Sequence, residues 1–226
     1  MAEPLAYEEP GDPIDFAPDF KTNPEPYGEP MPELLSLFKG LTRGSKVLDV
    51  AGGYGRYAMP LIESGLDVTI LDIHDASLEE AKRRKKAIKN PKKSGNLTLL
   101  KADILREKLP AMEKFDCVFS AGFLHHLSET ALQDTFKNMS ELLENNGTAI
   151  IEYSTNKNRR LPGGEKILVG GDPEHNSTLE EGIEITEGMY EDNGFKKPTI
   201  NVVHLCIRQP DFWYDADVIL ATGRLI

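Results

Sequence analysis

The chain alternates short apolar runs with segments in which apolar residues recur at helical spacing. Runs of apolar and β-branched residues predict five strands, at about 46–51, 66–71, 97–101, 115–120 and 148–153. Helical spacing predicts helices at 32–41, from Asp75 or Ser77 to about 90, and at 128–144. Ser77 begins a sequence that matches a capping box. Strands that alternate with helices favour a parallel sheet covered on both faces.

The pattern changes after residue 153. Residues 154–183 are polar and rich in glycine, and we expect them to form a long insertion loop. A helix at about 184–193 and two strands at about 198–207 and 216–223 follow. The two strands are too close for a helical crossover, so they should be antiparallel. The predicted fold class is α/β, a Rossmann-like sandwich with a seven-stranded, mostly parallel sheet and an antiparallel terminal strand pair.

The first thirty residues form a separate segment by composition. Seven prolines and many acidic residues exclude a long helix or a central strand there. Tyr7, Phe16, Phe20 and Tyr27 are nevertheless spaced through it, so we expect part of this arm to lie over the domain as a lid. The predicted organisation is an arm at 1–30 and a single domain at 31–226.

Composition and charge narrow the class of partner. The net charge of −11 over 226 residues argues against broad nucleic-acid binding, which needs lysine and arginine against phosphates. No apolar run approaches the length of a membrane span, and the N-terminus lacks the pattern of a signal peptide. Cys117 and Cys206 fall in strands predicted to be buried. We therefore expect a cytoplasmic protein that has no metal site and binds neither nucleic acid nor membrane.

The segment after the first strand carries the strongest chemical signal. Asp49 lies in an apolar run, and three glycines, Gly52, Gly53 and Gly55, follow within four positions. Glycine lets the backbone approach a ligand closely because it has no Cβ. Asp72 ends the next strand, where a carboxylate can accept hydrogen bonds from a ribose. Loop and acid together predict a pocket for an adenosine-containing cofactor.

These residues resemble a known family. The segment 49–55 is similar to the D-x-G-x-G-x-G motif of class I S-adenosylmethionine-dependent methyltransferases. Asp72, Asp103 and the segment 119–127 fall where the later motifs of that family fall, and the terminal antiparallel pair is typical of its fold. The resemblance covers roughly 32–226 and is sharpest at 46–152. Ala51 departs from it by replacing the first glycine, which is tolerable if its φ is negative.

The resemblance implies S-adenosyl-L-methionine as the cofactor and a role for each matching residue. Near the methionine part it places Asp49 and the loop backbone, which comprises Ala51, Gly52, Gly53 and Gly55. Asp72 would hold the ribose hydroxyls. Around the adenine it places Ile73, Asp103 and Ile104. Beside the sulfonium it places Ser120 and Ala121, with His126 toward the transferred methyl.

Several alternatives remain open at this point. Asp49 and Asp72 could instead cap nearby backbone, and His125 and His126 could be packed core residues. Arg56 either reaches the carboxylate of the cofactor or forms a surface ion pair.

Two other classes of protein compete with the methyltransferase. An NAD(P)-dependent oxidoreductase is suggested by the G-x-G-x-x-A pattern at 53–58 and by the spacing of Tyr153 and Lys157, although that spacing requires a helix. A non-catalytic subunit that binds S-adenosylmethionine is the other.

The methyl acceptor is less determined than the cofactor. The acidic balance and the lack of an Asn-Pro-Pro-Tyr or Asp-Pro-Pro-Tyr motif favour a small molecule over nucleic acid. We expect methylation of an oxygen or nitrogen atom. If the acceptor is an oxygen, His126, or otherwise His125, would remove or orient its proton. The sequence leaves the oligomeric state undetermined.

Overall fold

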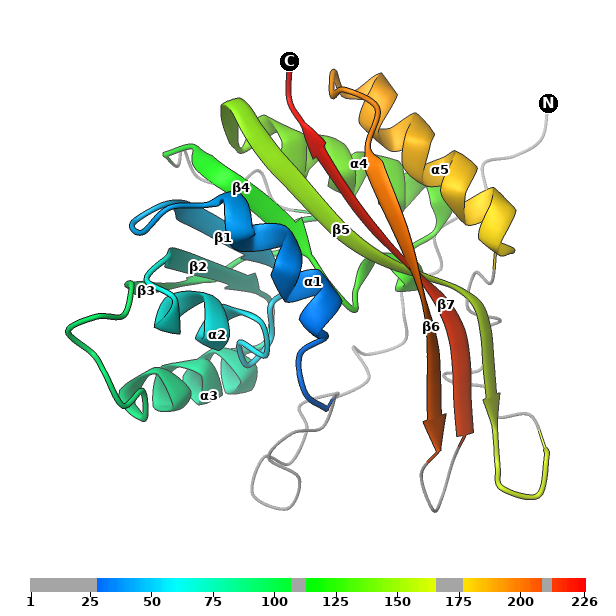
Figure 1. Cartoon of the computed structure of the whole chain (residues 1–226), viewed down its shortest axis with the longest axis horizontal. Helices are drawn as coiled ribbons and strands as arrows, with labels where there is room; N and C mark the ends of the chain where they lie inside the picture. Colours follow the sequence, from blue (N-terminus) through cyan, green and yellow to red (C-terminus); the bar gives the residue numbers. More distant parts are fainter. Residues whose placement is uncertain (1–27, 107–112, 166–176, 209–212) are drawn as a thin grey trace.

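The computed structural model describes residues 28–106, 113–165, 177–208 and 213–226, which form a sheet covered by helices on both faces (Figure 1). The helical elements are α1 (Pro32–Ser36), η1 (Leu37–Gly40), α2 (Ala58–Glu63), α3 (Asp75–Lys86), η2 (Leu124–His126), α4 (Glu129–Glu141) and α5 (Leu179–Asp192). The strands are β1 (Lys46–Val50), β2 (Asp67–Asp72), β3 (Leu97–Lys101), β4 (Phe115–Ser120), β5 (Leu143–Arg160), β6 (Thr199–Arg208) and β7 (Trp213–Arg224). The N-terminal arm lies largely outside the described residues.

The sheet has seven strands in the order β3-β2-β1-β4-β5-β7-β6. The five strands from β3 to β5 pair in parallel, whereas β7 is antiparallel to both β5 and β6. This confirms the predicted α/β fold with its antiparallel terminal pair. The carboxyl ends of the parallel strands meet at one edge of the sheet, where ligands bind in open α/β sheets.

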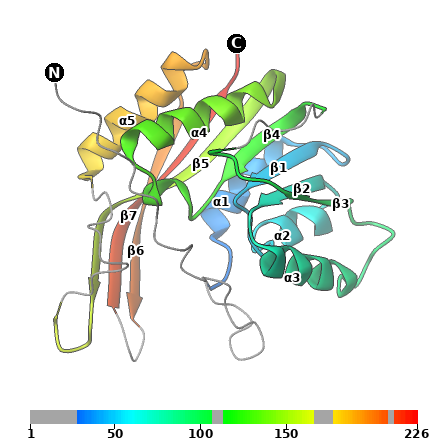
Figure 2. The ribbon, with the colours of Figure 1, turned by 180° about the vertical axis from the view of Figure 1, so that it is seen from behind.

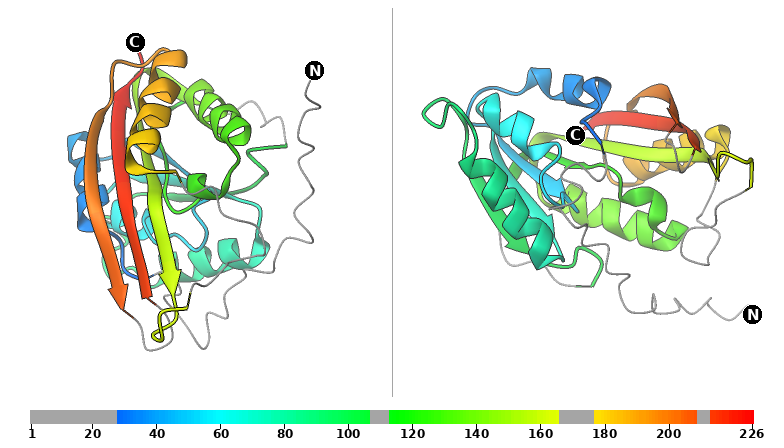
Figure 3. Two further views of the ribbon diagram at one scale, coloured as in Figure 1. Left: turned by 90° about the vertical axis from the view of Figure 1, so that its right-hand side faces the viewer. Right: turned by 90° about the horizontal axis from the view of Figure 1, so that it is seen from below.

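Two hydrophobic clusters, one on each face of the sheet, follow the alternation of side chains along the strands. Leu34, Ile62 and Leu78 bring α1, α2 and α3 onto one face. Phe136 and Tyr190 bring α4 and α5 onto the other. Figure 2 shows the molecule from the side on which α4 and α5 cover the sheet, and Figure 3 shows the two layers edge-on.

Asp49, Asp72 and Glu152 follow the same alternation as the residues of the first cluster. Each stands two positions after a strand residue in that cluster: Val47, Ile70 and Ile150. The three carboxylates therefore project from the α1–α2 face, near the carboxyl edge of the sheet.

The segment predicted as a loop at 154–183 is partly regular structure. Residues 154–160 continue β5 and pair with β7, from Ser154 opposite Val218 to Arg160 opposite Trp213. Their polar composition indicated a loop, but β pairing is made by the backbone, which is indifferent to it. The following helix also begins earlier than predicted, at Leu179, behind a Thr178–Glu181 capping box. Residues 166–176 lie outside the described part of the chain.

Two smaller predictions about helix ends and one about the burial of a cysteine were also wrong. The helix predicted to reach 144 ends at Glu141, and β5 begins at Leu143. The N-cap of α3 is His74, without a side-chain cap bond, so neither Asp75 nor Ser77 caps it. Cys206 is exposed because β6 forms an edge of the sheet, while Cys117 is buried as predicted. No helix among the described residues is long and apolar enough to cross a membrane.

Candidate active site

The glycine loop between β1 and α2 turns the chain sharply at the carboxyl edge of the sheet. Ala51, Gly53 and Gly55 all have positive φ, at 57°, 55° and 82°. A Cβ at Gly55 would stand 2.7 Å from Cε of Met59 and 3.1 Å from Cδ1 of Ile70, so these two side chains would have to shift to admit one. The Gly52 N–H donates to the Leu71 carbonyl at 3.3 Å, which ties the loop to β2.

Ala51 adopts a conformation that the sequence did not lead us to expect. A negative φ was the condition under which alanine would be tolerated at the first glycine of the motif. The observed φ of 57° is in the left-handed region, which costs an L-residue roughly 1–2 kcal/mol. The loop therefore keeps the backbone shape of a glycine at this position, and the alanine bears the strain.

Asp49 lies directly beneath this loop and is 3% exposed. Burial raises the pKa of its carboxyl well above the ordinary range, the charge of Asp72 adds to the rise, and Arg56 opposes it. A Cβ at Gly52 would stand 2.4 Å from the carboxyl carbon of Asp49. Glycine at 52 is thus what lets this carboxylate sit against the loop.

Asp72 joins the loop to the end of β2. One carboxylate oxygen, Oδ2, accepts the Gly53 N–H at 2.8 Å, and Oδ1 accepts the His74 N–H at 2.8 Å. The carboxylate is 7% exposed and retains further lone pairs for a ligand. Ile73 beside it is 46% exposed and offers an apolar surface next to the acid.

The segment after β3 supplies Asp103 and Ile104. Oδ1 of Asp103 accepts the Leu105 N–H at 2.9 Å, and Oδ2 lies 3.9 Å from Nε of Arg106. Ile104, in contrast, is 4% exposed and belongs to the cluster on the α4–α5 face. Asp103 is therefore the more accessible of the two.

The end of β4 supplies Ser120 and Ala121. The Ser120 hydroxyl is fully buried and donates to the Val50 carbonyl at 3.1 Å, which joins the ends of β4 and β1. Ala121 is half-buried and packs against the cluster on the α1–α2 face. Both residues stand at the carboxyl edge, where the sequence placed them.

The two histidines stand together on η2. Their ring centroids are 4.1 Å apart, with planes tilted by 46°. His125 is buried and His126 is exposed. The Lys157 amine donates to the His125 carbonyl at 3.1 Å, which ties η2 to β5.

Tyr153 and Lys157 have the spacing of a dehydrogenase pair, but they lie on strand β5 and not on a helix. The Tyr153 ring is buried in the core, where its hydroxyl meets that of Ser177 at 3.4 Å. The helix that the dehydrogenase reading requires is therefore absent at this position.

Glu152 is a buried site residue that the sequence analysis did not single out. It is 5% exposed on β5 and accepts the N–H of Gly122, just past the end of β4. Arg56 lies nearby, with its guanidinium 4.7 Å from the centroid of the Tyr57 ring. The signal that could have revealed Glu152 is an acidic residue directly after two apolar residues in a central strand.

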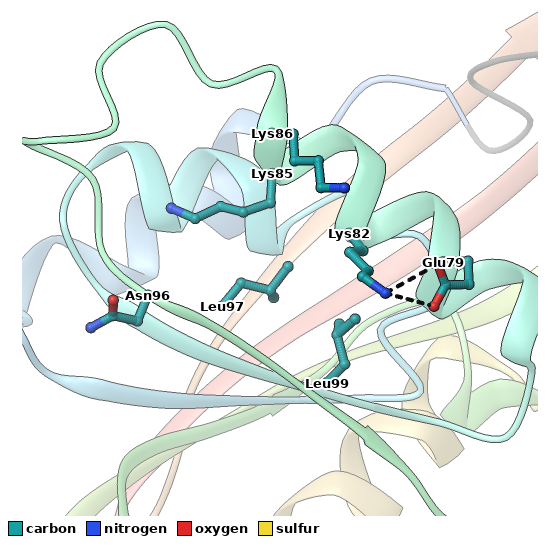
Figure 4. A pocket seen from close by; sticks show the side chains of 7 residues that line it. All are labelled: Glu79, Lys82, Lys85, Lys86, Asn96, Leu97 and Leu99. Carbon is teal, nitrogen blue, oxygen red and sulfur yellow. Dashed lines mark hydrogen bonds and ion pairs between the residues drawn. The ribbon is translucent and has the colours of Figure 1, made fainter.

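A groove lies between α3 and β3, the strand at one side of the sheet, away from the glycine loop. It is lined by Glu79, Lys82, Lys85, Lys86, Asn96, Leu97 and Leu99 (Figure 4). Lys82 pairs with Glu79, and Lys85 donates to the Ser94 hydroxyl and the Gly95 carbonyl. The groove meets β3 at its amino end and contains none of the residues of the glycine loop.

The sheet order and the glycine loop together define a class of protein by its fold, the class I methyltransferase architecture. Residues 47–147 match a family model described as a methyltransferase domain. No similar sequence was found among curated proteins.

Three solved structures illustrate the likeness. An S-adenosylmethionine-dependent methyltransferase from Methanosarcina mazei is 14% identical, with a TM-score of 0.67 over 88% of this chain and 99% of that one. The 1,6-didemethyltoxoflavin-N1-methyltransferase of Burkholderia thailandensis is 18% identical, with a TM-score of 0.61 over 86% and 77%. The magnesium protoporphyrin IX methyltransferase of Synechocystis PCC 6803, solved with bound S-adenosylmethionine, is 16% identical, with a TM-score of 0.58 over 85% and 76%.

The match over residues 47–147 identifies a methyltransferase domain in this part of the chain. The three solved structures, all below 25% identity, show that the chain has the fold of S-adenosylmethionine-dependent methyltransferases. The methyltransferase domain also displaces the oxidoreductase alternative.

The residues of the loop fit the cofactor of these methyltransferases. A Cβ at Gly53 would meet no atom of the described residues within 4 Å, so in that part of the chain the loop opens onto free space. That space adjoins the Asp72 carboxylate and the exposed side chain of Ile73, an acid and an apolar surface suited to a ribose and an adenine. The two acids Asp49 and Asp72 lie at this loop beside the cation Arg56, which suits a ligand carrying ammonium and sulfonium charges.

Proposed function

We propose that this enzyme transfers a methyl group from S-adenosyl-L-methionine to an oxygen or nitrogen atom of a small molecule. The observation that carries the proposal is the Asp72 carboxylate, fixed by the Gly53 N–H at the mouth of an open glycine loop. The Burkholderia and Synechocystis proteins, which are named as methyltransferases of 1,6-didemethyltoxoflavin and of magnesium protoporphyrin IX, support a small-molecule acceptor.

The acids divide the work of holding the cofactor. Asp72 accepts hydrogen bonds from the ribose hydroxyls with the lone pairs that Gly53 and His74 leave unused. In this proposal Asp49 and the loop backbone hold the methionine part, and Arg56 binds its carboxylate. Because Asp49 is buried beside another acid, a bound ammonium group would favour its ionised form.

The remaining contacts surround the base and the sulfur. Ile73 packs on the adenine ring, and Asp103 accepts a hydrogen bond from its amino group, with Ile104 supporting this segment from the core. Ser120 and Ala121 line the pocket beside the sulfur.

Bound S-adenosylmethionine supplies an activated methyl carbon, so the protein chiefly provides position and environment. A neutral amine needs no base before it attacks. A hydroxyl acceptor does, and in that case His126, which is exposed on η2, takes or orients the proton, with buried His125 as the second candidate.

Titration calorimetry with S-adenosylhomocysteine tests the cofactor assignment. Heat of binding is expected for the natural chain, and NAD should give none. Gly53→Arg, which fills the open space above the loop, should abolish binding. Absence of heat with S-adenosylhomocysteine, or full affinity in the arginine variant, would overturn the proposal.

The catalytic assignment has its own test. Replacing both His125 and His126 with alanine should reduce methylation of a hydroxyl acceptor at least tenfold while affinity for S-adenosylhomocysteine is retained. Unchanged turnover would remove the histidines from the mechanism. A screen for methyl transfer by the isolated chain separates an enzyme from a silent binding subunit.

A further inference from the structure

Glu152 stands where β5 outruns its neighbour β4. In the register of the two strands Ser120, the last residue of β4, lies opposite Ile151. Glu152 is therefore the first residue of β5 beyond that pairing, and from there β5 continues to Arg160 against β7 alone. Its side chain is thus at the carboxyl edge, one strand further from β1 than Ser120 and Ala121.

The carboxylate of Glu152 is held by two neutral donors. Oε2 accepts the Gly122 N–H, and Oε1 accepts the Ser154 hydroxyl at 2.9 Å. Within the described ranges no ion pair reaches this carboxylate, although it is only 5% exposed. A buried carboxylate held as an acceptor, without a cation bonded to it, is a favourable partner for a ligand that brings a positive charge.

The backbone at Gly122 leaves space for such a ligand. Its φ is +75°, and a Cβ there would lie 3.6 Å from Nη2 of Arg56 and 3.9 Å from Oε2 of Glu152; apart from its two chain neighbours, no other atom of the residues that the structure describes comes within 4 Å. Because Gly122 has no side chain, the space between the cofactor side of the site and the Glu152 carboxylate is unobstructed at this point. The hydrogen bonds from the Ser154 hydroxyl and the Gly122 N–H fix the orientation of the Glu152 carboxylate beside this space.

We propose that Glu152 receives the methyl acceptor and that the acceptor is an amine. This inference rests on the proposed methyl transfer and selects nitrogen from the two atoms considered there. Glu152 accepts a hydrogen bond from an N–H of the acceptor and so turns the nitrogen lone pair toward the pocket beside Ser120 and Ala121.

The reaction balances without a further reagent. An acceptor that enters as an ammonium ion first gives one proton to water. The nitrogen lone pair then forms the N–C bond to the methyl carbon while the C–S bond breaks and its electron pair stays on sulfur. The products are a neutral thioether and a methylated ammonium ion, whose charge faces Glu152.

The charge of Glu152 explains the choice of atom. A nitrogen acceptor gains positive charge in the transition state, and a fixed carboxylate stabilises that charge. An oxygen acceptor that has lost its proton is negative and would be repelled by the same group. Asp49 and Asp72 on the same face strengthen this preference.

The test uses three probes of nearly one shape but different charge: benzylamine, benzyl alcohol and benzoate. Each is titrated into the full chain saturated with S-adenosylhomocysteine, and binding is followed by calorimetry. A charge-assisted hydrogen bond predicts that benzylamine, protonated at neutral pH, binds at least about tenfold tighter than benzyl alcohol. Benzoate should bind weakest.

Two variants assign the preference to the residue. Glu152→Gln keeps the shape and should bring benzylamine within about twofold of benzyl alcohol. Glu144→Gln, an exposed position at the start of the same strand, should leave the natural preference intact.

The proposal is overturned if the natural chain binds benzylamine no better than benzyl alcohol, or if the preference survives in Glu152→Gln. S-adenosylhomocysteine affinity is measured first for every variant and should be unchanged. If the natural chain does not bind S-adenosylhomocysteine, the proposed function itself is refuted. Failure of the amine preference and failure of the proposed function are therefore distinguishable. The probe comparison in the natural chain decides the matter even where the glutamine variant does not fold.

Discussion

Replacing Ala51 with glycine should stabilise this protein, although glycine usually destabilises. Ala51 and Gly53 lie two residues apart in one loop with nearly the same backbone, at φ of 57° and 55°. One carries a Cβ in the left-handed region and the other does not. Alanine and glycine can therefore be exchanged between positions 51 and 53, which moves one methyl group and changes nothing else.

The expected size follows from two opposing contributions. A left-handed conformation costs an L-residue roughly 1–2 kcal/mol. Against this, glycine at 51 gains freedom in the unfolded chain, which costs about 0.4–1 kcal/mol. The free energy of unfolding should thus rise by about 1 kcal/mol in Ala51→Gly, which for a chain of this size raises Tm by about 2–4 °C.

Gly53→Ala provides the mirror image. A Cβ at 53 would meet no atom within 4 Å across the described ranges of the chain, so this variant adds strain without a clash there. Tm should fall by a similar amount, and the double variant Ala51→Gly with Gly53→Ala should return close to the natural value. Scanning calorimetry of the four proteins, without added ligand, measures all three differences. A Tm that stays level or falls in Ala51→Gly would refute the strain at this position.

Three further predictions concern the loop and the core. Gly52→Ala would put a methyl 2.4 Å from the Asp49 carboxyl carbon, about 1 Å closer than ordinary contact. Overpacking of about 1–3 kcal/mol should lower the affinity for S-adenosylhomocysteine about tenfold or more, measured by calorimetry. Equal affinity in the variant and the natural chain would contradict this. Because the native state raises the pKa of Asp49, it holds that proton more tightly than the unfolded chain, so this contribution to stability is present at low pH and is lost as the pH rises through the raised pKa. Asp49→Asn should therefore flatten the decline in unfolding free energy above about pH 4, measured by urea titration; an unaltered slope would count against it. Tyr190→Phe removes a buried hydroxyl that lies 3.0 Å from the Ala149 carbonyl and 3.1 Å from that of Ala221, and should cost about 1–3 kcal/mol in thermal melts; full stability would show that these bonds contribute nothing.

The parallel core of the fold was predictable because its strands are buried on both faces. Val47 to Val50 read as a continuous apolar run broken by one acid, and the structure buries all four residues. The antiparallel pairing of β6 and β7 was predictable from the short gap between them alone. In each case a single local rule points to one arrangement.

The extension of β5 to Arg160 was not predictable from local composition. Its residues are polar, and only pairing with β7, about sixty positions later in the chain, makes them a strand. The same holds for Glu152, whose significance depends on Gly122 lying opposite the end of β4. Neither contact leaves a periodic signal in the sequence.

The candidate site was predictable in its acids and less so in its backbone. Asp49 and Asp72 lie near one another, as the motif spacing indicated, and the charge of one acts on the other. The positive φ at Ala51 was not predictable, because the shape of the loop is set by the bonds from Gly52 and Gly53 to β2 and not by residue 51 itself. Burial of Ile104 reflects packing from α4, which the segment after β3 does not encode.

The position of β7 in the sheet has a consequence for biosynthesis. β7 separates β5 from β6, although β6 precedes it in the chain, and among the strands that the structure describes β6 pairs with β7 alone. A ribosome therefore releases β6 before the partner that accommodates it, and β5 meanwhile has one side without an antiparallel neighbour. During that interval both strands present open hydrogen-bonding edges that could recruit foreign chains. Only when β7 is in place can the sheet close this gap, so residues 213–224 decide how much newly made protein escapes aggregation.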